Sequence, residues 1–272
     1  MAFCDYHIHT CYSFDGDRSA TPEAICKAAI ERGLTDIAIT DHFEVNAIPE
    51  GIDTPYDADA AFESVMQVKE IYGKRLNITY GIELGQASQY PDIANDFLRK
   101  YPVEFVLASL HNLRGKPDFY YMDFSRIDED EISSLYSAYL SELLEMINAL
   151  NKIDAIGHIT YPFRYIARAG KVVDASQFYD GLADIFSVLV KKDVALELNV
   201  STYAKGYGFT MPTPDILSLY RECGGRLITL GTDAHSPSAV GIAIPYAAEL
   251  AKSVGFDSAL VIRGGQKELI KL

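Results

Sequence analysis

Short apolar runs alternate with longer amphipathic segments along the chain. The short runs predict buried strands, and the segments with apolar residues at i, i+3, i+4 and i+7 predict helices packed against them. The predicted strands cover residues 2–9, 34–40, 77–84, 104–110, 155–158, 194–200 and 227–231. The predicted helices cover about 22–33, 57–72, 92–100, 132–150, 178–189, 214–224 and 245–253, and the tail 258–272 predicts a small hairpin or strand pair.

This alternation predicts an α/β fold with a parallel sheet and crossover helices. Helix-to-strand connections are short, whereas the strand-to-helix connections 43–56, 112–130, 159–174 and 200–213 are long. Long loops on one side only are typical of a (βα) barrel whose site lies at the C-terminal face of the strands. An open doubly wound sheet is the alternative, but seven strand–helix units favour a closed or nearly closed barrel. No linker or repeat interrupts the pattern, so we expect a single domain over residues 1–272.

The composition suits a soluble globular protein, with 49% apolar and 23% charged residues. The formal net charge of −14 argues against a long nucleic acid and against anionic membranes as partners. No apolar run is long enough for a transmembrane helix, and the first residues lack the pattern of a signal peptide. The cysteines show no paired spacing, which indicates a reducing cytoplasmic location. They are Cys4, Cys11, Cys26 and Cys223.

Every one of the six histidines lies at the C-terminal end of a predicted strand or a few residues beyond it. They are His7, His9, His42, His111, His158 and His235. Glu83 ends the third strand, and Asp233 follows the seventh. A lone histidine is usually a surface or core residue, but packing explains poorly why all six share one end of the strands.

This arrangement predicts a metal site. Residues i and i+2 of a strand point to the same face, so His7 and His9 can bind one ion together. Glu83 and Asp233 can add oxygen ligands, and a carboxylate can bridge two ions. Imidazole-rich sites with bridging carboxylates hold two metals about 3.5–4 Å apart for phosphoester hydrolysis. For the cysteines, a structural role is expected instead.

Seven short motifs, taken together and in order, resemble the PHP (polymerase and histidinol phosphatase) superfamily. They are His-Ile-His-Thr, Ser-Phe-Asp, Ile-Thr-Asp-His, Gly-Ile-Glu, Ser-Leu-His, Gly-His and Gly-Thr-Asp-Ala-His, spread over residues 5 to about 241. The stretch Ala-Leu-Glu-Leu-Asn at 195–199 further resembles the stand-alone histidinol-phosphate phosphatase branch. The resemblance implies a distorted seven-stranded (βα)7 TIM-like barrel.

The resemblance also implies three divalent ions of zinc, manganese or iron. The implied ligands of the first ion are His7, His9, Glu83 and Asp233. The second ion would share Glu83 and take His111 and His158. The third would take His42, His235 and Asp15, with Asp17 as a rival for the last position.

The implied reaction is hydrolysis of L-histidinol phosphate, a small phosphorylated substrate, by attack of a metal-bridging hydroxide. Glu83, Asp233 and Asp15 are the candidate catalytic carboxylates, and Asp233 or Asp15 could carry the proton to the leaving alcohol. For the phosphate, Arg164 is the first candidate, because its loop must cover the mouth. Lys205 is the second, and Asn112 could donate to phosphate or simply finish a strand.

Three alternatives stay open at this point. The same barrel could act on another small phosphate ester, such as a nucleotide or an oligonucleotide end. An amidohydrolase-type barrel also opens with His-X-His but often carries a bridging lysine on strand four, where this chain has His111. A metal-stabilised binding barrel would have lost ligands that this chain keeps. Three ions with neutral imidazoles would also make the mouth locally positive, in contrast to the acidic chain.

Overall fold

The computed structural model describes residues 3–272, and Ala2, which the first predicted strand includes, lies outside them. Seven parallel strands form the sheet in the order β1-β2-β4-β5-β6-β7-β8, and β3 pairs with β4. The strands are β1 (Cys4–Ile8), β2 (Asp36–Ile39), β3 (His42–Glu44), β4 (Asn77–Gly85), β5 (Phe105–Ser109), β6 (Ala155–Ile156), β7 (Ala195–Asn199) and β8 (Ile228–Gly231).

The first and last of these strands meet, so the sheet is nearly closed. Ile8, the last residue of β1, and Ala234, which follows β8, form a parallel bridge. The His9 amide donates to the Ala234 carbonyl at 2.8 Å. The predicted barrel is thereby confirmed, and the open doubly wound sheet is not formed.

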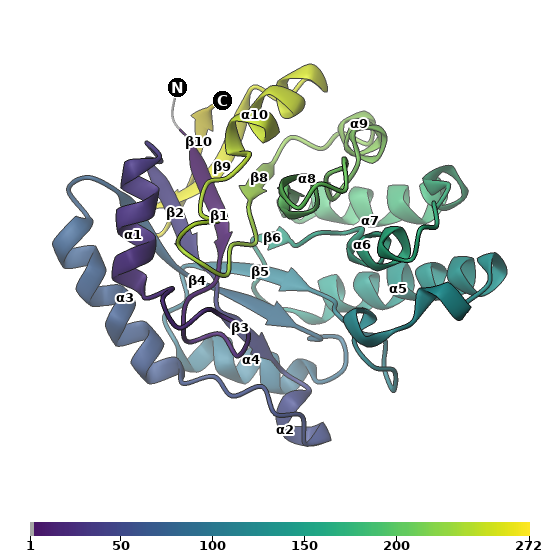
Figure 1. Cartoon of the computed structure of the whole chain (residues 1–272), viewed down its shortest axis with the longest axis horizontal. Coiled ribbons are helices and arrows are strands. Elements are labelled where there is room, and N and C mark those ends of the chain that lie inside the picture. Colours follow the sequence, from purple (N-terminus) through teal and green to yellow (C-terminus); the bar gives the residue numbers. More distant parts are fainter. Residues whose placement is uncertain (1–2) are drawn as a thin grey trace.

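Helices surround the sheet (Figure 1), and most of them match the predicted ranges. They are α1 (Pro22–Glu31), α2 (Ala47–Glu50), α3 (Ala58–Tyr72), α4 (Pro91–Lys100), α5 (Glu129–Ala149), α6 (Tyr161–Arg168), α7 (Tyr179–Lys191), α8 (Ser201–Ala204), α9 (Pro214–Glu222) and α10 (Ile244–Ser253). Thr21 caps the N-terminus of α1, because its Oγ1 accepts from the Ala24 amide. Within residues 3–272, no helix has both the length and the apolar character needed to cross a membrane.

The long connections are less irregular than the sequence predicts. The segment 43–56 carries most of β3 and all of α2, and 200–213 carries α8. The segment 159–174 carries α6, which places Arg164 on a helix and not in a loop. Two 3-10 turns, η1 (Phe119–Tyr121) and η2 (Phe124–Arg126), lie in 112–130. A third turn, η3 (Ala175–Phe178), directly follows the segment 159–174. Elements this short have too few periodic positions to be distinguished from loops in the sequence.

The predicted C-terminal hairpin is confirmed as β9 (Ser258–Arg263) and β10 (Gln266–Lys271), and it packs on β8, β1 and β4. Tyr6 Oη accepts from the Ile262 amide at 2.6 Å and lies 3.2 Å from Thr79 Oγ1. Arg263 donates to both oxygens of the buried Asp36 at 2.8 Å. Asp36 is the first residue of β2, so the hairpin packs at the N-terminal ends of the strands. The predicted metal ligands lie near or beyond the C-terminal ends, so the hairpin covers the barrel away from the site.

Candidate metal centre

Four of the predicted ligands converge beside the end of β1. Glu83 Oε2 lies 3.2 Å from His7 Nε2 and 3.4 Å from His9 Nε2. Asp233 Oδ1 lies 3.8 and 3.5 Å from the same two nitrogens. His7, His9 and Asp233 thus form one group of possible ligands, and Glu83 lies beside both histidines.

Glu83 also faces the second predicted group with its other oxygen. Its Oε1 lies 3.2 Å from His111 Nε2 and 3.0 Å from His158 Nε2. The Glu83 side chain is fully buried. This carboxylate therefore stands between the two sets of imidazoles, the position that a bridging ligand occupies.

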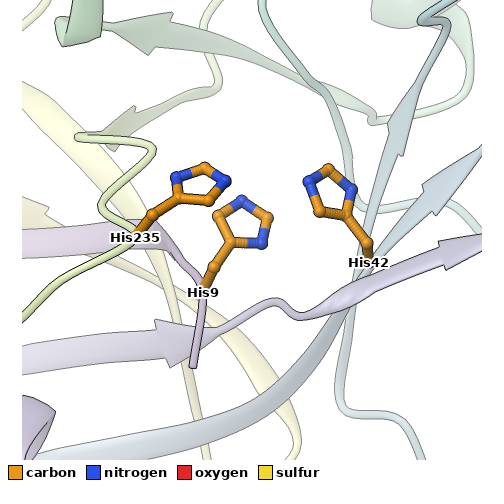
Figure 2. A group of neighbouring side chains, drawn as sticks. All are labelled: His9, His42 and His235. Carbon is orange, nitrogen blue, oxygen red and sulfur yellow. The ribbon is translucent and has the colours of Figure 1, made fainter. Parts of the chain in front are cut away.

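The third predicted group lies at the edge of the same cluster, where the rings of His9, His42 and His235 face one another (Figure 2). Asp15 Oδ2 is 3.0 Å from His235 Nε2 and 3.7 Å from His42 Nε2. The other nitrogen of His42, Nδ1, lies 3.0 Å from Glu83 Oε2, so this ring joins the edge to the centre. Asp17, the rival of Asp15, accepts instead from the Ser19 amide.

The residues present fit metal ions. His7 Nε2, His9 Nε2, His42 Nδ1 and Glu83 Oε2 are buried without a hydrogen-bond partner. Leaving such a group unpaired costs about 1–3 kcal/mol, so native proteins rarely keep them without a ligand. Neutral imidazole and carboxylate are the donors that zinc, iron and manganese accept. The possible ligand groups within residues 3–272 contain only histidine and carboxylate, and the structural role of the cysteines stays a prediction.

Two carboxylates that the sequence analysis did not assign orient these imidazoles. Glu197 on β7 lies 2.6 Å from His7 Nδ1 and accepts from the His158 amide at 2.6 Å. Glu44 on β3 lies 3.0 Å from His111 Nδ1, in hydrogen-bond geometry, and 3.1 Å from His42 Nδ1, without a hydrogen bond. Partners of this kind fix the ring orientation of a ligating histidine.

Both carboxylates carried a signal in the sequence. Glu44 stands two residues after His42, the same spacing as His7 and His9. Glu197 is a charged residue in the middle of an apolar strand. Gly231 is required beside it, because a Cβ there would collide with the Glu197 carboxylate and with His7.

Burial and charge act together on the titrating groups. Burial would lower the pKa of His7, but Glu197 and Glu83 raise it well above its usual range. Burial, with His235 and His42 nearby, lowers the pKa of His9 to about 3. Burial would raise the pKa of Asp233, but Arg164 and the neighbouring histidines together hold it well below its usual range.

Arg164, the first candidate for phosphate binding, contacts Asp233. Its Nη2 donates to Asp233 Oδ2 at 2.7 Å and also to Ser201 Oγ. Asp233 has φ = +54°, a strained value for a residue other than glycine. Arg164 thus holds the outer oxygen of Asp233 while Oδ1 faces His7 and His9.

A cavity of about 820 Å³ lies over the cluster and is lined by all three candidate substrate-binding residues. Lys205 is exposed to it at the end of α8. Asn112 donates from its side-chain amide to the carbonyls of Leu113 and Lys116, which fixes the start of the following loop. Nothing in this geometry tests their contact with substrate, which stays a prediction.

The family model described as PHP domain matches residues 5–201. The chain belongs to the PHP domain family. It is 26% identical over 268 residues to a histidinol-phosphatase of Lactococcus lactis, covering 97% of this chain and 96% of that protein. A probable histidinol-phosphatase of Clostridium acetobutylicum is also 26% identical and is covered to 92%, as is this chain.

A solved structure is similar over almost its whole length. It is the histidinol phosphate phosphatase of Lactococcus lactis in complex with zinc, L-histidinol and phosphate. The TM-score is 0.82 at 25% identity, with 98% of both chains covered. The resemblance to PHP proteins and the predicted enzyme class, a phosphomonoesterase, are confirmed by these relatives.

Proposed function

We propose that this chain is a metal-dependent phosphomonoesterase that hydrolyses L-histidinol phosphate to L-histidinol and phosphate, as a single cytoplasmic domain. The observation that carries the proposal is the set of buried, unpaired ligand atoms in the barrel mouth. It is supported by the relative that binds zinc, L-histidinol and phosphate in a similar fold. The cavity volume of about 820 Å³ suits a small ester.

Three ions fit the donor set. His7, His9, Glu83 and Asp233 would hold the first, and the other oxygen of Glu83 with His111 and His158 would hold the second. His42, His235 and Asp15 would hold the third, at the exposed edge. Zinc, manganese and iron all accept these donors.

Bound divalent ions would activate a water and offset the negative charge of the phosphoryl oxygens. Around them, Glu83 would fix the spacing of the first two positions, and Arg164 would keep Asp233 aimed at His7 and His9. Arg164 and Lys205 both line the cavity, so they would supply the cations for the phosphoryl oxygens.

The leaving alcohol needs a proton, and Asp15 is the better placed of the two candidate carriers. Its side chain is 40% exposed, and the polar contacts that it makes with His42 and His235 both use Oδ2. Asp233 by contrast has Oδ1 directed at two histidines and Oδ2 bound by Arg164.

Initial rates on a panel of monoesters, with metal content measured on the same sample, test the proposal. The panel contains L-histidinol phosphate, a mononucleotide and a 5′-phosphorylated oligonucleotide. We expect the highest kcat/KM on L-histidinol phosphate, loss of activity with a chelator, and recovery with zinc, manganese or iron. Faster turnover of the mononucleotide would overturn the substrate, and full activity of metal-free protein would overturn the metal dependence.

A further inference from the structure

The cavity over the metal centre has charged groups of both signs. Arg164 and Lys205 lie near Asp233. At another part of the wall, near His111 and Glu44, stands Asp118. The cations suit the phosphate, but they leave the role of the carboxylate unexplained.

Asp118 is held by one oxygen only. As the residue before η1, it accepts from the Tyr120 amide at 2.6 Å and from Tyr161 Oη at 3.3 Å, both through Oδ1. Within residues 3–272, Oδ2 has no hydrogen bond, and no lysine or arginine forms an ion pair with this carboxylate. Burial raises the pKa of Asp118, and the nearby His111 offsets this effect only in part.

Asp118 also lies within reach of an ester bound at the metal centre. Tyr161, whose hydroxyl it contacts, has its ring centroid 4.8 Å from that of His158 and 5.0 Å from that of His111. The amide of the next residue, Phe119, donates to the His111 carbonyl at 3.0 Å. One phenol ring thus separates the carboxylate from two of the predicted ligands.

We propose that Asp118 is a specificity residue whose free oxygen binds the ammonium group of the leaving alcohol. The inference rests on the proposed function, because L-histidinol phosphate carries an ammonium on the carbon next to the esterified CH₂. An ammonium placed there neutralises the half-buried carboxylate and forms a charge-assisted hydrogen bond with it. Two exposed aromatic side chains on the same cavity, Phe14 and Tyr121, offer apolar surface to the rest of the alcohol.

The test compares Asp118→Asn with the wild type on two esters, L-histidinol phosphate and 3-(imidazol-4-yl)propyl phosphate, which lacks only the amine. Asparagine keeps the cap of η1 but loses the charge. We expect kcat/KM for L-histidinol phosphate to fall roughly tenfold to a hundredfold, with little change for the amine-free ester. Inhibition by L-histidinol should weaken by a similar factor.

Asp123→Asn is the matched control, because Asp123 caps η2 in the same way but does not line the cavity over the metals. It should leave the ratio of the two esters unchanged. An equal loss on both esters in Asp118→Asn would indicate a structural role and overturn the inference, and so would no loss on either.

Failure of the proposed function has a different signature. A second pair, 2-aminoethyl phosphate and ethyl phosphate, measures the preference for an amine without the imidazole. If L-histidinol phosphate is a poor substrate but Asp118 still governs the preference within this pair, the substrate is wrong and the cation subsite stands. A wild-type enzyme without preference for the amine in either pair would overturn the subsite.

Discussion

The two ends of this barrel treat buried polar groups in opposite ways. At the hairpin end two prominent groups are paired: Tyr6 Oη binds the Ile262 backbone, and both Asp36 oxygens accept from Arg263. At the mouth, His7, His9 and Glu83 each keep a buried atom without a partner. Both ends belong to the same strands, since β1 carries Tyr6 and His7 side by side.

This difference separates stability from function. Pairing at the hairpin end satisfies groups that folding removes from water, and it contributes to holding β9 and β10 on the barrel. The unpaired atoms of the mouth lower the stability of the metal-free chain and are explained by a ligand. Substitutions at the mouth should therefore change activity more than stability, and those at the hairpin end should do the reverse.

The largest effect on activity is expected from Glu83→Gln. Glu83 contacts five imidazoles, and an amide cannot bridge two ions as a carboxylate does. We expect kcat/KM on L-histidinol phosphate to fall on the order of a thousandfold or more, with fewer metal ions per chain by elemental analysis. Full metal content with unchanged kcat/KM would contradict the bridging role.

A smaller loss is expected from Glu197→Gln, which acts through His7 and His158. Removing an orienting partner of a ligating histidine costs about 10- to 100-fold in metal affinity or activity. Metal titration of the apo-protein should show weakened binding. Glu104→Gln is the control, because its carboxylate binds Lys69 and the Tyr80 amide away from the centre. Equal losses in both variants would point to a general structural effect.

The contacts of Glu44 and Glu197 with the histidines could not be predicted from the sequence. Periodicity and strand ends predicted the barrel and brought His7, Glu83 and Asp233 to one place, because parallel strands all end on the same face. Glu197 is 190 residues from His7, and its contact depends on the register between strands that are not neighbours in sequence. A local pattern carries no such information.

The same limit applies to Arg164. Its proximity to the mouth was predicted, but the Tyr-Pro start of α6, which favours a helix, was not used, and its partner Asp233 is 69 residues away. The predicted loop was therefore wrong at this residue, and phosphate binding by Arg164 stays a prediction. Burial and pairing of single side chains are properties of tertiary structure.

Arg164→Lys distinguishes two roles of Arg164, the positioning of Asp233 and the binding of phosphate. Lysine keeps the charge but cannot donate to Ser201 and Asp233 as a planar fork does. We expect kcat/KM to fall about tenfold, mainly in kcat if Asp233 loses its orientation and mainly in KM if phosphate contact is lost. Arg168→Lys on the same helix, which contacts Tyr120 and not Asp233, should have a much smaller effect.

The smallest effect on activity is expected at the hairpin end, from Arg263→Leu. This change leaves the fully buried Asp36 carboxylate without its cation. Arg263 is itself 38% exposed, so solvent screens part of the loss, and we expect the free energy of unfolding to drop by about 1–3 kcal/mol. Denaturant unfolding measures this drop, while kcat/KM should stay within about twofold, because the substitution removes no group from the reaction site. If activity fell with stability unchanged, the two ends of the barrel would be coupled, and the division between a paired end and a reactive end would fail.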